Sequence, residues 1–116
     1  MKVVINKCWG GFSISKVAAE FMAKRGNKRA KAILSEDKKE WYGYLTLGSD
    51  KDGDYYVIEK QIRSDPDLVA AVEALGESAN GELARLVIVT VPDDAKWYIE
   101  NYYGMESVHQ EHEVYG

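Results

Sequence analysis

Two adjacent glycines, Gly10 and Gly11, constrain the fold of this chain more than any other feature. They separate an apolar, strand-like segment from a helix-like one, and Trp9 and Phe12 flank them. Glycine adopts positive φ without steric cost and lets another group approach the backbone closely. We call residues 9–12 the glycine joint, and we expect it to turn the chain sharply from strand to helix.

A helix is predicted after the joint, because apolar residues recur there at helical spacing. They are Ile14, Val17, Ala18 and Phe21. Ser13 or Ser15 can cap the first amides of this helix, and Gly26 followed by Asn27 is a natural left-handed stop. The glycine amides and the helix start together predict an anion niche with aromatic walls.

The remaining pattern predicts an α+β fold, with a mostly antiparallel or mixed sheet of about five strands and two main helices packed on it. The predicted strands are residues 2–7, 41–47, 55–60, 83–91 and a segment starting at Trp97. The second helix begins at Ser64-Asp65-Pro66-Asp67 and carries an apolar stripe at Leu68, Val72, Leu75 and Ala79. Residues 27–40 fit a short helix or a loop, and residues 106–115 fit a short strand or a helical turn.

Length and composition favour one domain, residues 1–116, with a single core. No apolar run is long enough to span a bilayer, so we expect no membrane partner. The apolar stretch near the N-terminus is too short for a signal peptide. Cys8 is the only cysteine, which favours a reducing compartment such as the cytoplasm.

Charge is divided unevenly along the chain. Residues 1–63 contain 13 basic and 8 acidic residues, whereas residues 64–116 contain 2 basic and 11 acidic ones. The basic cluster at residues 24–31 can contact phosphates, and Trp41, Tyr42 and Tyr44 follow it like a stacking platform. The acidic second half makes long nucleic acid an unfavourable partner, but a small nucleotide avoids this repulsion. The alternative is a solvated helix face with charge complementarity between halves or protomers.

No motif for catalysis or metal binding is complete. The sequence lacks the phosphate-binding loop, the dinucleotide fingerprint and the nucleophile elbow. The Asp50-Asp52-Asp54 series resembles a calcium loop, but Tyr55 replaces its glycine and Gln61 its bidentate glutamate. His109 and His112 are too few for an ordinary first-row metal site. We therefore predict no catalytic residues, no metal and no cofactor, and favour a binding protein over an enzyme.

Three tryptophans and eight tyrosines exceed what one small core needs. Surface aromatic residues are enriched at interfaces, which suggests a homo-oligomer or an aromatic-lined pocket. The alternative is that several of the tyrosines form cross-strand pairs on one sheet.

The chain resembles a widespread family of small phage and prophage proteins of unassigned function. The motifs that carry the resemblance are VINKCWGGFS at residues 4–13, RSDPDLV at 63–69, PDD at 92–94 and the W-x-I-x-x-Y-x-G pattern from Trp97 to Gly104. The LG and ANG sequences at residues 75–76 and 79–81 also match. The tail at residues 110–115, QEHEVY, departs from the basic tail of the family.

This resemblance implies an accessory protein that blocks host machinery in the host cytoplasm. We hypothesise a non-catalytic anti-defence protein that sequesters a small phosphorylated nucleotide signal. The alternative is an inhibitor or accessory protein that contacts a host or virion protein. The residues expected to bind the ligand are Trp9, Gly10, Gly11, Phe12, Ser13, Ser15, Arg25, Arg63 and Asn80.

Overall fold

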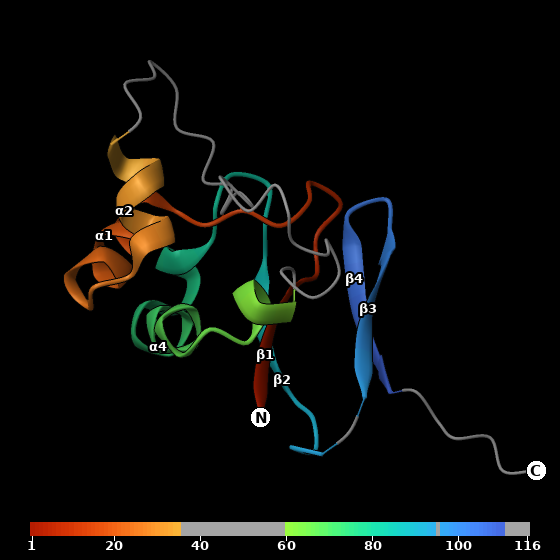
Figure 1. Cartoon of the computed structure of the whole chain (residues 1–116). Helices are drawn as coiled ribbons and strands as arrows, with labels where there is room; N and C mark the ends of the chain where they lie inside the picture. The colour runs from red at the N-terminus through yellow and green to blue at the C-terminus, as the bar shows by residue number, and fades with distance from the viewer. Residues whose placement is uncertain (36–59, 95, 111–116) are drawn as a thin grey trace, which may run out of the picture.

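The computed structural model describes residues 1–35, 60–94 and 96–110, and it confirms the α+β class (Figure 1). In chain order the elements are β1 (Lys2–Asn6), α1 (Lys16–Lys24), α2 (Lys28–Ser35), α4 (Pro66–Leu75), the 3₁₀ helix η1 (Gly76–Ala79), β2 (Leu86–Thr90), β3 (Trp97–Tyr102) and β4 (Met105–Gln110).

The strands differ from the predicted single sheet of about five strands. Within the described residues there are two antiparallel two-stranded sheets, β1 with β2 and β3 with β4. The predicted hairpin of residues 41–47 and 55–60 lies outside the described residues, except for Lys60, which is helical together with residues 61–63. The undecided segments are resolved in part, because residues 28–35 form α2 and residues 105–110 form β4.

The β1–β2 ladder is covered on both faces, which explains its continuous apolar sequence. Val4 and Leu86 belong to the core cluster on the helical side, which includes Ala18, Met22, Leu68 and Val72. Val3 and Ile5 instead face a second cluster with Val91 and Trp97, against which Val87, Val89, Ile99 and Val108 pack. The β3–β4 hairpin thus packs side chains onto β1–β2 rather than extending its hydrogen-bonded ladder.

The helix ends follow from their local sequence. Ser15 caps α1 by accepting a hydrogen bond from the Ala18 amide at 3.1 Å, and Asp65 caps α4 through the Asp67 amide at 2.8 Å. Gly26 follows α1 with φ of 91°, as predicted. The second helix is shorter than predicted, since Gly76 takes φ of 56° and residues 76–79 continue as a 3₁₀ turn.

The start of the chain is tied to the segment after β2. The Met1 ammonium donates to the Val91 carbonyl and to Asp93, and this contact holds the pKa of the Asp93 carboxyl below its usual value. None of the helices in the described ranges is long and apolar enough to cross a membrane.

Candidate functional site

Three loops meet at one end of the molecule, and their glycines explain how closely they approach. They are the glycine joint, residues 81–85 and the turn between β3 and β4 (Figure 1). A Cβ at Gly10 would lie 2.2 Å from Leu83, and one at Gly104 would lie 2.3 Å from the Trp9 carbonyl oxygen. These two glycines are therefore needed for backbone contact within the chain.

The buried side chain of Asn6 holds the three loops together. Its Nδ2 donates to the carbonyls of Cys8 and Gly104, each at 2.7 Å, and its Oδ1 accepts from the Arg85 amide at 2.8 Å. Because Asn6 is completely buried, these bonds replace water that cannot reach it. One amide side chain thus fixes three segments relative to one another: the residue before the glycine joint, the loop at residues 81–85 and the β3–β4 turn.

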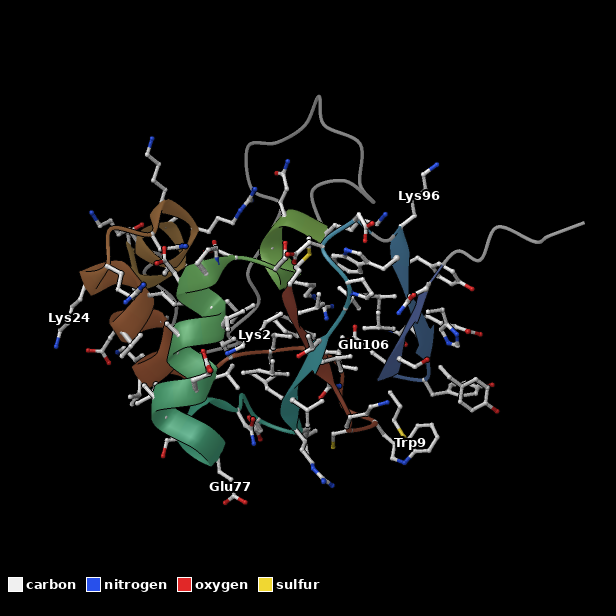
Figure 2. All side chains as sticks on the ribbon, turned by 90° about the horizontal axis from the view of Figure 1, so that it is seen from below. Lys2, Trp9, Lys24, Glu77, Lys96 and Glu106 are labelled. Atoms are coloured by element: carbon white, nitrogen blue, oxygen red, sulfur yellow. The ribbon has the colours of Figure 1, made fainter. Side chains whose placement is uncertain are left out.

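A buried ion pair fastens the hairpin to the body of the protein. Arg63 donates to Glu106 Oε1 at 2.6 Å and to Oε2 at 2.7 Å. The backbone N–H of Asn6 also donates to Oε1, at 2.7 Å. The Arg63 guanidinium lies 3.8 Å from the centre of the Phe12 ring. Arg63 is 5% exposed and Glu106 2% exposed, and Figure 2 shows Glu106 in the interior. Arg63 therefore serves the docking of β4, and Phe12 covers it.

An exposed apolar surface lies over the meeting point of the loops. We call it the aromatic tip and define it as Trp9, Leu83, Tyr102 and Tyr103, which are 61–76% exposed. The Trp9 ring lies 6.1 Å from the Tyr102 ring and 6.3 Å from the Tyr103 ring, and the two tyrosine rings lie 4.7 Å apart. Leu83 is assigned to this surface because its backbone and Cβ lie against Gly10, the residue next to Trp9.

Two residues of the aromatic tip have a strained backbone. Leu83 has φ of 60° and Tyr103 has φ of 50°, and no other non-glycine residue in the described part of the chain has positive φ. Tyr103 and Gly104 form a two-residue hairpin turn with positive φ at both positions, the signature of a type I′ turn. That turn favours Asn or Asp where this chain has tyrosine. Large side chains are thus held at positions that disfavour them.

The polar residues of the predicted anion niche contact other parts of the chain. Ser13 Oγ donates to the Glu82 carbonyl at 3.4 Å, and Ser15 Oγ donates to the Ser78 carbonyl besides capping α1. Asn80 accepts from the Leu86 amide at 2.8 Å. Among the described residues, no buried side-chain nitrogen or oxygen lacks a hydrogen-bond partner. The polar side chains predicted for the niche therefore take part in internal contacts in this structure.

The structure does not bring all the predicted ligand-binding residues to one place. Arg25 lies at the end of α1 and pairs with Asp67 at 2.9 Å, next to Lys24. Figure 2 shows Lys24 and Trp9 at opposite ends of the molecule. Trp9, Gly10, Gly11 and Phe12 lie at the joint, where Gly11 has φ of 88° and open space beside its Cα.

The structure describes one of the two histidines considered in the sequence, His109. His109 lies on β4, where its Nε2 is 2.9 Å from both Ser107 Oγ and Glu100 Oε2, and its ring stacks on Tyr98. A catalytic triad needs the acid and the hydroxyl on different ring nitrogens, so this arrangement is a cross-strand cluster. His112 and the Asp50-Asp52-Asp54 series lie outside the described residues. No group of three potential metal ligands occurs in the described ranges.

Three members of the aromatic tip, Leu83, Tyr102 and Tyr103, were absent from the predicted site. The Tyr102-Tyr103-Gly104 sequence carried the signal, because a glycine after a strand-like run marks a hairpin turn and exposes what precedes it. Leu83 gave no such signal, since it reads as the first residue of a buried strand. No protein-family model matches this chain, and neither a curated protein nor a solved structure shows a significant match.

Proposed function

We propose that this chain is a non-catalytic accessory protein that binds another protein through its aromatic tip. The observation that supports this most strongly is that both strained non-glycine residues of the described chain are exposed and apolar, and lie on this one surface. Backbone strain of this kind costs about 1–3 kcal/mol per residue and clusters at binding sites.

The composition of the aromatic tip suits protein recognition. Trp and Tyr dominate the binding energy of interfaces, particularly where they form a central apolar cluster. The tip also rests on a rigid base, because Asn6 and the Arg63–Glu106 pair fix its three loops. A preorganised surface loses little conformational entropy on binding.

The resemblance to phage and prophage proteins suggests the kind of partner. In that setting the partner is a host defence protein or a component of the virion, and binding blocks or scaffolds it. This is the alternative that the sequence already offered, and the geometry supports it better than the nucleotide hypothesis.

Sequestration of a small phosphorylated nucleotide is the second candidate. Exposed aromatic rings can stack on bases, which is the observation in its favour. The Trp9 ring is tilted by 60° and 49° from the two tyrosine rings, so these rings do not sandwich a flat base. Among the predicted cationic ligands, Arg25 pairs with Asp67 and Arg63 with Glu106. The two hypotheses therefore differ in which residues must contact the ligand.

A capture experiment tests the protein-binding proposal. The chain is immobilised, a protein retained from bacterial lysate is identified and purified, and its Kd is measured by calorimetry. We expect the Trp9→Ala and Tyr102→Ala variants to weaken binding about tenfold or more, as for interface hot spots. Both side chains are exposed, so folding is preserved.

The matched control is Val17→Ser, which removes an apolar side chain that is 52% exposed on α1, outside the tip. It should leave Kd unchanged. Equal affinity for the Trp9→Ala variant and the unmodified chain would refute the proposal. Calorimetry of the chain with cyclic di- and trinucleotides and cyclic ADP-ribose isomers tests the second candidate, and absence of heat across this panel would eliminate it.

A further inference from the structure

The outer strand of the hairpin, β3, has an open edge. Its partner β4 faces the body of the protein, where Glu106 accepts from the Asn6 amide of β1. Tyr98, Glu100, Asn101 and Tyr102 of β3 are exposed, whereas Trp97 is buried in the second core cluster. One long side of β3 therefore points away from the body.

The register shows which backbone groups lie along this edge. In a hairpin with a two-residue turn, the closing pair Tyr102↔Met105 is hydrogen-bonded, and hydrogen-bonded pairs then alternate. The N–H and C=O groups of Trp97, Ile99 and Asn101 consequently point away from β4. No backbone contact of the described residues outside the hairpin uses these groups.

This edge has few of the features that usually prevent strand pairing. Natural edge strands carry charged residues, especially lysine, or proline or a bulge, or are very short. The sequence of β3, WYIENY, contains neither lysine nor proline, its one charged residue is Glu100, and its six residues pair with β4 without a bulge. An edge of this kind is a template for another strand.

We propose that β3 pairs antiparallel with β3 of a second copy, about a two-fold axis at Ile99. Only residues of the same hydrogen-bonding type can face each other in an antiparallel pair, so the axis must pass through a residue. An axis at Glu100 opposes two glutamates, which is unfavourable. An axis at Tyr98 pairs only residues 97–99 within β3, whereas the axis at Ile99 pairs residues 97–101.

The side chains in this register are complementary. Tyr98 faces Glu100 of the second copy, and Trp97 faces Asn101, so no two like charges are opposite each other. Each Glu100 also comes near the Tyr98–His109 stack of the other copy, which resembles its existing contact with His109 at 2.9 Å. The result is a four-stranded sheet, β4–β3–β3–β4, closed by two-fold symmetry.

Light scattering after size-exclusion chromatography tests the dimer. The full chain should show a mass near twice 13.1 kDa, with the monomer appearing on dilution. Ile99→Pro removes the outward N–H while leaving the β3–β4 bonds intact, so we expect the dimer Kd to rise at least about tenfold. Ile99→Ala is the matched control, because it truncates the side chain but keeps the N–H, and it should remain dimeric.

Cysteine cross-linking tests the register, in a Cys8→Ser background. The double variant Tyr98→Cys/Glu100→Cys should form a covalent dimer on oxidation, since these positions oppose each other across the axis. Neither single variant should do so, because like positions are then about 7–8 Å apart. A monomeric mass at all concentrations, a dimer unaffected by Ile99→Pro, or cross-linking of a single variant would overturn the proposal.

Discussion

Tyr103 combines an unfavourable backbone with a large exposed ring, so stability and binding should respond to it in opposite directions. Its φ of 50° in a two-residue turn is the position where Asn before Gly is preferred. A left-handed backbone costs an L-residue with a large side chain roughly 1–2 kcal/mol. We infer that the tyrosine is retained for contact rather than for folding.

Replacing Tyr103 by asparagine should therefore raise the free energy of unfolding by about 1 kcal/mol. Urea denaturation followed by tryptophan fluorescence measures this. The same variant should bind the captured partner about tenfold more weakly or worse. Tyr103→Ala is the control, since it removes the ring but keeps the strain, and should lose affinity without gaining stability. A Tyr103→Asn variant with full affinity would show that the ring makes no contact.

At this scale the sequence predicted the caps well and the internal partners of other polar residues less well. Asp65 and Ser15 act as caps, since a cap depends only on neighbouring amides. Arg63 was predicted to contact a ligand, whereas here it pairs with Glu106, 43 residues away. No local pattern could indicate that partner, because the pairing depends on how the hairpin packs.

Among the elements, the Arg63–Glu106 pair should decide whether the β3–β4 hairpin stays docked. Glu106 neutralises a buried guanidinium and also accepts the Asn6 amide. Removing one partner of a buried pair typically costs about 3–5 kcal/mol, because the other charge is left uncompensated. The pair therefore connects β4 to β1 and to residues 60–63.

Glu106→Ala should lower the free energy of unfolding by about 3–5 kcal/mol in urea denaturation. The double variant Arg63→Met/Glu106→Leu should recover much of this loss, since it leaves no buried charge. Glu77→Gln, at an exposed position of η1, is the control and should change stability by less than about 0.5 kcal/mol. A loss below about 1 kcal/mol for Glu106→Ala would mean that water reaches the pair.

Element positions were largely predictable, but their assembly was not. The apolar runs of β1 and β2 indicated strands, which is correct, and both faces of the ladder are covered. The same runs predicted interior strands of one larger sheet, whereas among the described residues β1 and β2 pair only with each other. Stacking of β3–β4 on these strands instead of alongside them depends on contacts at Gly104 and Glu106, which only the folded chain brings together. The glycine joint was identified correctly as a sharp turn, but the group that approaches Gly10 is Leu83 of the same chain.

In the whole molecule, the basic helices and the aromatic tip lie at opposite ends, as Lys24 and Trp9 show in Figure 2. Lys28 and Lys31 lie in the first turn of α2, where the helix dipole is unfavourable to cations. Because the cations lie at one end and the aromatic tip at the other, substitution of the cations distinguishes the two functional hypotheses.

Changing Lys24, Lys28 and Lys31 together to glutamine should leave the Kd for the captured protein within about twofold, because these residues are far from the tip. The melting temperature should stay equal or rise slightly, since two cations leave the positive end of α2. Binding should also change little between 0.05 and 0.5 M salt, unlike recognition of phosphates. A loss of affinity above about tenfold in the triple variant would show that the basic helices contact the captured protein and would contradict binding through the aromatic tip alone.

The pairing of β1 with β2 also determines when this protein can fold during synthesis. Lys2 pairs with Thr90, so after Lys2 is made, 88 more residues must follow before the full ladder can form. At ribosomal speeds of about 5–20 residues per second, this delay is roughly 4–18 s. Throughout that time the Val3-Val4-Ile5 segment lacks its partner strand, which makes the nascent chain a natural client for chaperones that bind short apolar stretches.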